Sequence, residues 1–253
     1  MVEIVSLLFG AMIGSFLNVC ICRLPKGESI VFPGSHCPQC RQPVRFYDNI
    51  PILSYLWLRG KCRSCHCPIS IQYPVVEAVT AISSLLLVLT FGPSWSALIY
   101  FAFTAALIAI TFIDLHHQII PDLISLPGIG AGLLASLVLP RITFLDALFG
   151  AFLGGGSLFL VATIYQWLFN REGMGGGDIK LLAMIGAFLG WKAVILTILL
   201  SSLIGSVTGV AVMLIKGKDF KYAIPFGPFL SLGAILSLFC GETIIRCYLN
   251  FHR

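Results

Sequence analysis

The sequence predicts an all-α, polytopic membrane protein, and three observations support that prediction. Of its 253 residues, 58% are hydrophobic and only 11% are charged. The mean hydropathy of +0.96 is far above that of a water-soluble domain, which needs a polar surface. Apolar runs of about twenty residues recur, the length that crosses a hydrocarbon core about 30 Å thick. Because backbone groups in lipid must pair within their own segment, these runs are expected to be helices.

Eight apolar segments are expected to form the membrane helices, and counts of seven and nine also fit the pattern. The sixth segment is short and begins at a glycine-rich stretch, so a half-length or re-entrant element fits as well. The first ends in Cys22-Arg23 without a small-residue cleavage site, so it is expected to be a retained helix and not a removed signal peptide. The eight segments lie near residues 2–22, 75–91, 94–113, 122–139, 144–168, 178–190, 192–215 and 223–247.

The distribution of basic residues predicts the orientation. Most of the 16 Lys and Arg residues lie in or beside the loops that follow odd-numbered spans. The positive-inside rule therefore places these loops in the cytoplasm and the N-terminus outside. Contact with anionic lipid suffices to explain the net charge of +5, so no nucleic-acid partner is expected. The expected organisation is a first transmembrane helix (1–22), a cytoplasmic loop domain (23–74) and a multi-helix membrane domain (75–253).

The cytoplasmic loop carries two C-x2-C pairs, in HCPQC (36–40) and CRSC (62–65), with a spacer of 21 residues between them. Four thiolates at this spacing suit a tetrahedral, structural zinc ion in a ribbon-like module. Disulfides are the alternative, which the reducing cytoplasm disfavours. A loop with few apolar residues would take much of its folding energy from the metal. The four expected ligands are Cys37, Cys40, Cys62 and Cys65, and the neighbouring side chains of His36, His66 and Cys67 are further candidates.

Two aspartates lie where a charge is costly. Asp114 ends the third expected span, in ITFIDLHHQIIPD, and Asp178 begins the sixth, in GGGDIKLL. Both are expected at the cytoplasmic ends of their spans, where a carboxylate at membrane depth is usually functional. Two carboxylates that meet share one proton, as in an aspartyl protease, where one takes a proton from water and the other polarises the amide carbonyl. Asp122, after Pro121, is expected to cap the fourth span instead.

Glycines precede the second of these aspartates. Gly175 and Gly177 form a GxGD pattern with Asp178. Lacking side chains, they are expected to act as a hinge and to let an extended substrate strand lie close to the carboxylate. The alternative is a flexible loop in which Asp178 serves as a helix cap. GxGD alone is a short pattern, but a second aspartate at matched depth favours catalysis.

Taken in order, five segments make the chain resemble the type IV prepilin peptidases, which are GxGD-type membrane aspartyl proteases, over essentially its whole length. The first three are GAMIGSFLNVCICRLP (10–25), the two C-x2-C pairs, and IDLHHQIIPD (113–122). The last two are GMGGGDIKLLAMIGAFLGW (173–191) and IPFGPFL (224–230). The resemblance implies that Asp114 and Asp178 are the catalytic aspartates and that the four C-x2-C cysteines bind zinc.

The resemblance also implies an activity and its partners. Members of that family cut a short basic leader from prepilins or pseudopilins at the cytoplasmic face of the bacterial inner membrane. They then methylate the new N-terminal amine with S-adenosylmethionine. Some members lack both the cysteines and the methyl transfer, whereas this chain retains the cysteines. Zinc, S-adenosylmethionine, a pilin-type substrate and membrane lipid are therefore the expected cofactors and partners.

The residues that would hold the methyl donor are not assigned by the sequence. It has no glycine-rich strand-to-helix turn of the kind that soluble methyltransferases use. Asn18, Glu77 and the Gly14-Ser15 pair are candidates, because they lie in the N-terminal segment or near helix ends. Helix packing for the small pair, and an interfacial charge for Glu77, explain them equally well.

Three other kinds of protein share some of these features. A GxGD intramembrane protease of the presenilin or signal-peptide-peptidase type would place its first aspartate after a tyrosine and would have no N-terminal zinc loop. A cation transporter that uses the same aspartates would show paired broken helices and polar residues near the bilayer midplane. Here the carboxylates are expected near one face. A zinc-dependent docking module would not need so many spans.

Overall fold

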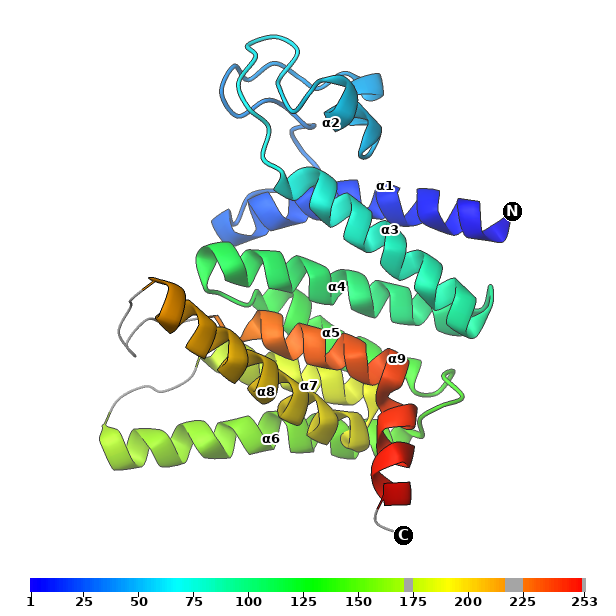
Figure 1. Cartoon of the computed structure of the whole chain (residues 1–253), viewed down its shortest axis with the longest axis vertical. Helices are drawn as coiled ribbons and strands as arrows, with labels where there is room; N and C mark the ends of the chain where they lie inside the picture. Colours follow the sequence, from blue (N-terminus) through cyan, green and yellow to red (C-terminus); the bar gives the residue numbers. More distant parts are fainter. Residues whose placement is uncertain (171–174, 217–224, 252–253) are drawn as a thin grey trace. The chain divides into compact units, whose positions relative to one another are not determined.

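The computed structural model of the chain describes residues 1–170, 175–216 and 225–251 (Figure 1). It divides into two compact units, Met1–Ala109 and Ile110–Arg253, and helix α4 contributes to both. The three-part organisation expected from the sequence stays a prediction. Within the described ranges the α-helices are α1 (Val2–Arg23), α2 (Leu53–Trp57), α3 (Gln72–Phe91), α4 (Trp95–His117), α5 (Asp122–Ala135), α6 (Phe144–Phe169), α7 (Gly176–Leu189), α8 (Trp191–Lys216) and α9 (Gly227–Phe251).

The all-α membrane class is confirmed, and each of the eight expected segments coincides with one helix, α1 or α3 to α9. Six of these helices are long and apolar enough to cross a membrane: α1, α3, α4, α6, α8 and α9. Helices α5 and α7 have 14 residues each, which makes them about 21 Å long and shorter than a hydrocarbon core. The sixth segment is thus half-length, and the fourth ends earlier than expected. Parts of two expected loops, 171–174 and 217–224, lie outside the described residues.

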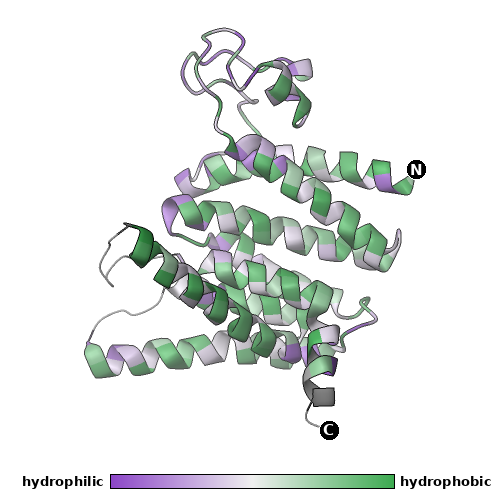
Figure 2. Cartoon of the chain, in the orientation of Figure 1, coloured by the Kyte–Doolittle hydropathy of each residue, from purple (hydrophilic) through white to green (hydrophobic). Residues whose placement is uncertain are grey.

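Most residues of the long helices are hydrophobic, whereas the segment between α1 and α3 is more hydrophilic (Figure 2). In the first unit, α1 and α3 lie side by side (Figure 1). A Cβ added at Gly10 would lie 2.7 Å from Cα of Ala81, and one at Gly14 would lie 2.7 Å from Cα of Glu77. Two glycines one turn apart therefore let the helix backbones approach closely, as small residues do in membrane helix pairs. Gly14 is a packing residue.

In the second unit, the short helix α7 is the central element. It packs against α5 and α6, and its residues Leu181–Phe188 are all buried. Backbone contact with α6 is direct, because a Cβ added at Gly186 would meet the carbonyl oxygen of Gly150, and one at Gly154 would meet that of Leu182. A helix enclosed on several sides holds the residue at its N-terminal end in a fixed position, and that end carries Asp178.

Candidate active site

Asp114 lies near the C-terminal end of α4 and is buried, with 5% of its surface exposed. Its Oδ2 atom accepts a 3.0 Å hydrogen bond from the backbone N–H of Gly227, at the first residue of α9. A Cβ added at Gly227 would lie only 2.6 Å from that oxygen. A glycine is therefore required at position 227 for the backbone to reach the carboxylate.

Asp178 is the third residue of α7, which has Gly175 as its N-cap, and its side chain is partly buried. No side-chain hydrogen bond caps this helix. Asp146 occupies the same position in α6 and does act as a cap, since it forms a capping box with Thr143. The expectation that favoured a functional carboxylate over a cap at Asp178 is consistent with this contrast.

The structure brings Asp114 and Asp178 together, although 64 positions separate them in the sequence. The two carboxylates lie within electrostatic range of each other. Ile120 connects their surroundings: a Cβ added at Gly177 would lie 2.8 Å from Cβ of Ile120, and one at Gly227 would lie 3.2 Å from its Cδ1. The residue that precedes Asp178 and the residue that hydrogen-bonds to Asp114 therefore pack on the same side chain.

The two glycines of the GxGD pattern have different surroundings. Gly175 has an extended backbone, with φ −70° and ψ 137°, which any residue adopts. A Cβ there would meet only Asp178 Oδ2, at 3.8 Å. Gly177 is sterically constrained, because Ile120 occupies the space that a side chain would need. In this structure close packing, and not a special backbone conformation, explains Gly177, and the hinge role of both glycines stays a prediction.

One ion pair beside the aspartates was not expected from the sequence. Lys180 Nζ lies 2.7 Å from Oδ1 and 2.8 Å from Oδ2 of Asp122 and so joins α7 to the start of α5. The expected capping role of Asp122 is wrong, because the N-cap of α5 is Pro121 and no side-chain hydrogen bond caps the helix. The Asp122 carboxylate instead pairs between helices, with a lysine two residues after Asp178 in α7.

The polar segment between α1 and α3 holds a second cluster of functional side chains. Four cysteine Sγ atoms lie within 4.8 Å of one another, and this is the arrangement that a tetrahedral metal site requires. The backbone N–H of Cys40 lowers the pKa of the Cys37 thiol to about 6 by hydrogen-bonding to its sulfur. Thiolates bind zinc, so the donor set fits this metal. The four cysteines are Cys37, Cys40, Cys62 and Cys65.

The two C-x2-C pairs form equivalent knuckles. In the first, the N–H of Cys37 donates to the carbonyl of Gln42 at 3.0 Å, and in the second the N–H of Cys62 donates to that of Cys67 at 2.8 Å. The fifth residue of each knuckle has a left-handed backbone, with φ 57° in both cases. The backbone of each knuckle therefore turns in the same way, and each knuckle directs its two cysteine sulfurs toward the same cluster. Those left-handed residues are Arg41 and His66.

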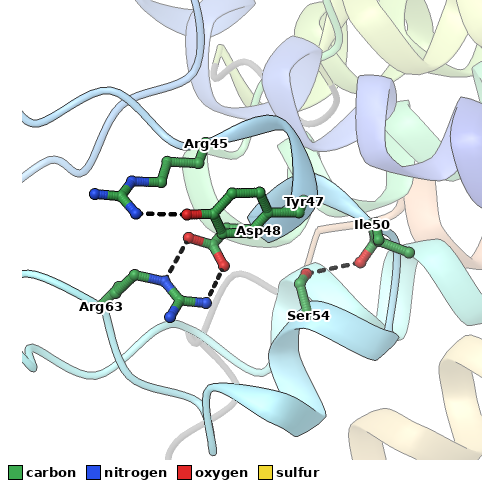
Figure 3. A network of polar contacts seen from close by, with 6 residues as sticks. All are labelled: Arg45, Tyr47, Asp48, Ile50, Ser54 and Arg63. Atoms are coloured by element: carbon green, nitrogen blue, oxygen red, sulfur yellow. Dashed lines mark hydrogen bonds and ion pairs between the residues drawn. The ribbon is translucent and has the colours of Figure 1, made fainter.

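A polar network links the segment that follows the first knuckle to the second knuckle (Figure 3). Arg63 binds Asp48 through two hydrogen bonds, of 2.6 Å and 2.8 Å. These bonds hold the pKa of Asp48 below its usual range. The Arg63 and Arg45 guanidinium carbons lie 5.4 Å and 5.8 Å from the centre of the Tyr47 ring. Because Arg63 lies between Cys62 and Cys65, this network supports the position of the second knuckle.

Both parts of the chain match known family models. Residues 8–91 match the bacterial peptidase A24 N-terminal domain, and residues 101–210 match the type IV leader peptidase family. Similarity to whole proteins extends over nearly the entire chain. A prepilin leader peptidase/N-methyltransferase from Aeromonas hydrophila is 40% identical, over 96% of this chain and 92% of that protein. The chain belongs to the type IV leader peptidase family.

Other members of the family are similarly close. The prepilin leader peptidase/N-methyltransferase of Pseudomonas aeruginosa is 39% identical over 97% of this chain and 93% of its own length. That of Neisseria gonorrhoeae is also 39% identical, over 94% of this chain and 90% of its own. No solved structure matches the chain significantly. The resemblance expected from the five sequence segments is confirmed.

The sequence predicts as site residues the two aspartates and the four cysteines that the structure brings together in two separate clusters. It does not predict three residues beside the aspartates. The three residues are Gly227, Ile120 and Lys180, which pairs with Asp122. A signal for two of them was present, because Gly227 lies in the IPFGPFL segment and Ile120 in IDLHHQIIPD. Their contacts depend on helices that are distant in the sequence.

Proposed function

We propose that this chain is a membrane aspartic endopeptidase that removes the leader of type IV prepilins or pseudopilins and then N-methylates the new N-terminal residue. The observation that carries the proposal is the pairing of Asp114 and Asp178. Both carboxylates lie at ends of apolar helices and within electrostatic range of each other. The relatives named prepilin leader peptidase/N-methyltransferase support both activities.

Cleavage follows from a shared proton on this pair. The ionised aspartate takes a proton from a water molecule as the water oxygen attacks the amide carbon. The protonated aspartate donates a hydrogen bond to the amide carbonyl and then helps protonate the departing amine. The hydrogen bond from the N–H of Gly227 to Asp114 Oδ2 favours the ionised form of that carboxylate. Asp114 therefore acts as the base that activates water, and Asp178 carries the proton.

The cysteine cluster serves as a structural zinc site in this proposal. Cys37, Cys40, Cys62 and Cys65 supply four ligands, which leaves no open position for a reacting water. When bound, the metal links the two knuckles and replaces an apolar core that the polar segment lacks. The relatives' names include N-methyltransferase, and S-adenosylmethionine is the methyl donor that the family resemblance implies for the second reaction.

The protein lies in the bacterial inner membrane, with the N-terminus outside and the catalytic aspartates at the cytoplasmic side. The distribution of Lys and Arg supports this orientation. The family resemblance implies a short basic leader that is cut on the cytoplasmic side, which fits this placement of the aspartates. Substrate and membrane lipid are the partners.

The test is a cleavage assay on a purified prepilin, followed by mass spectrometry, with S-adenosylmethionine added. Asp114→Asn and Asp178→Asn are expected to reduce cleavage at least about 10²-fold, the range that removal of a general acid or base produces. Asp146→Asn is the matched control. It also removes a carboxylate from the third position of a helix, but that carboxylate belongs to a capping box and not to the aspartate pair. Its cleavage rate is expected to stay near that of the wild type.

Other outcomes separate the alternatives. If both aspartate variants cleaved at the wild-type rate while remaining folded, the aspartyl mechanism would be wrong. Cleavage of the substrate within its transmembrane helix, and not after its leader, would indicate a protease of the presenilin type. A transporter would be indicated if the wild type took up cations into proteoliposomes but cleaved no substrate, and if both variants abolished the uptake.

A further inference from the structure

A buried carboxylate in the first unit has no part in peptide cleavage. Glu77 lies in α3 with 7% of its surface exposed. Its Oε2 accepts a 2.7 Å hydrogen bond from the backbone N–H of Ile52. Among the described residues no Lys, Arg or His forms an ion pair with it. An ionised carboxylate accepts up to about four hydrogen bonds, so Glu77 has capacity for a cationic ligand.

A second acceptor lies at the same junction of α1 and α3. Asn18 is 1% exposed, and its Nδ2 donates to the carbonyl of Tyr73 at 3.1 Å and to that of Gly14 at 3.3 Å. Its Oδ1 is buried and has no hydrogen-bond partner within the described part of the chain. Tyr73 is one turn before Glu77, whose Cα packs on Gly14. Asn18 and Glu77 therefore lie close together at one helix interface, where Oδ1 of Asn18 has no donor among the described residues and the Glu77 carboxylate has one from Ile52.

The junction borders a cavity. A space of about 260 Å³ lies between α1 and the segment that follows it, close to the lower size limit of small-molecule sites, about 300 Å³. Ser15, which follows the Gly14 that packs on Glu77, lines this space together with Arg23 and Asn49. Phe16, Val31 and Pro33 supply an apolar wall. The cavity thus combines one guanidinium and one amide with an apolar surface, next to a carboxylate.

The segment that covers the junction has an unusual backbone at the point where Glu77 binds it. Ile52 has φ 62° and ψ −51°. This conformation is rare for a β-branched residue and occurs mainly where the surroundings impose it, often at functional sites. The N–H of that residue donates to Glu77, so the carboxylate is fixed in one orientation by the loop that carries the metal ligands.

We propose that this junction is the methyl-transfer site and that Glu77 is the residue that accepts the proton of the substrate amine. The inference rests on the methylation in the proposed function and names its place. Methylation of an N-terminal ammonium forms an N–C bond, breaks the S–C bond of a sulfonium donor and releases one proton. The ammonium first gives one proton to a Glu77 carboxylate oxygen, and the lone pair that this frees on nitrogen forms the bond to the methyl carbon. The sulfur keeps the electron pair of the broken S–C bond.

The residues present fit both reactants. A sulfonium and an ammonium are cations, and a buried carboxylate with an unpaired amide oxygen beside it favours both. Arg23 donates to the carbonyls of Ser29 and Gly34 and has five N–H groups in all, so donors remain for the carboxylate of S-adenosylmethionine. The apolar wall suits an adenine ring. Oδ1 of Asn18 adds an acceptor, unpaired within the described residues, to the negative side of this junction.

The decisive variant is Glu77→Gln, which keeps the size of the side chain and removes its proton acceptor. We expect it to cleave a prepilin at the wild-type rate and to retain its zinc, while methylation of the product falls about 10²- to 10⁴-fold. Glu28→Gln is the matched control, since Glu28 is an exposed carboxylate in the same unit. Cleavage and methyl mass are read in the same spectra, and zinc is measured by mass spectrometry of the metal.

A second variant tests the cavity by a binding measurement. Ser35 lines it and is exposed, so Ser35→Trp is expected to fill the space and to weaken S-adenosylmethionine binding at least about tenfold in calorimetric titration. Wild-type affinity in Ser35→Trp, or wild-type methylation in Glu77→Gln, would overturn the inference and leave the proposed function intact. A wild-type enzyme that cleaves without adding a methyl group would instead refute the methylation on which the inference rests.

Discussion

The backbone N–H of Gly227 donates a 3.0 Å hydrogen bond to Oδ2 of Asp114, from a residue 113 positions further along the chain. This bond joins the start of α9 to the end of α4 and gives one of the two aspartates a fixed donor. A donor favours the ionised carboxylate. The two aspartates therefore have different surroundings, which a pair with different roles in proton transfer requires.

Gly227→Ala is expected to abolish most cleavage without unfolding the protein. The added methyl group would lie 2.6 Å from Asp114 Oδ2, so the carboxylate or the start of α9 must move. A displacement of about 1 Å at a reacting group costs on the order of 10²-fold in rate. Gly205→Ala is the control, because its methyl group would make an ordinary 3.6 Å contact with the Phe229 ring. Equal cleavage rates in the two variants would contradict the positioning role of Gly227.

The Lys180–Asp122 ion pair is expected to hold α7 against α5 with a small energy. Both side chains are partly exposed, at 36% and 57%, and such pairs contribute about 0.2–1 kcal/mol. Lys180→Gln and Asp122→Asn are therefore each expected to destabilise the protein slightly, with a coupling energy of that size in a double-mutant cycle. Thermal unfolding in detergent measures it. Strictly additive effects would show that the pair does not stabilise the folded state.

Close packing between α6 and α7 predicts a large effect at Gly186. Its backbone contacts that of Gly150, so the side chain of Gly186→Val has no space and is expected to cost about 1–3 kcal/mol. Gly156→Val, on α6, is the control, because nothing lies within 4 Å of a Cβ added there. The midpoint of thermal unfolding is the measurement. A similar midpoint in both variants would mean that the two helices separate easily.

The four-cysteine cluster predicts one tightly bound zinc ion per chain. Cys62→Ser is expected to lose most of this metal, because three thiolates and a hydroxyl bind zinc much more weakly. Cys240→Ser serves as the control, since Cys240 is an exposed cysteine in the other unit. Metal content after dialysis against a weak chelator decides the matter. Unchanged zinc in Cys62→Ser would exclude this cluster as the metal site.

The Asp48–Arg63 pair predicts how firmly the second knuckle is held. Asp48→Asn removes both hydrogen bonds to Arg63, so zinc transfer to a coloured chelator at neutral pH is expected to be a few-fold faster. Glu28→Gln, which removes an exposed carboxylate from the same loop, is expected to leave the rate unchanged.

The pH dependence of this pair has a definite sign. Because hydrogen bonds from Arg63 lower the pKa of Asp48 in the folded state, its contribution is fully present above the ordinary pKa of about 3.9. The contribution is lost as the pH falls through the lower folded-state value. The rate difference between wild type and Asp48→Asn should therefore be constant from pH 5 to pH 8. A difference that disappeared within that range would contradict the assignment.

The sequence by itself determined the features that depend on local composition and spacing. Hydrophobic runs predict membrane helices because lipid leaves the backbone no other way to pair its polar groups. Two residues between cysteines fix the geometry of a knuckle, and so the spacing alone predicts the four cysteines as metal ligands. Asp114 and Asp178 were identified for a similar reason, since a carboxylate in apolar sequence is costly wherever the chain goes.

Only the tertiary structure decided the contacts between segments far apart in the chain. The lengths of α5 and α7, the hydrogen bond from Gly227 to Asp114 and the pairing of Lys180 with Asp122 all depend on how helices pack. Glu77 reads in the sequence as an interfacial charge, yet the loop that covers it provides the N–H of Ile52 and buries it. Hydropathy is a property of neighbours in sequence, whereas these contacts depend on how segments that are distant in the sequence pack against each other.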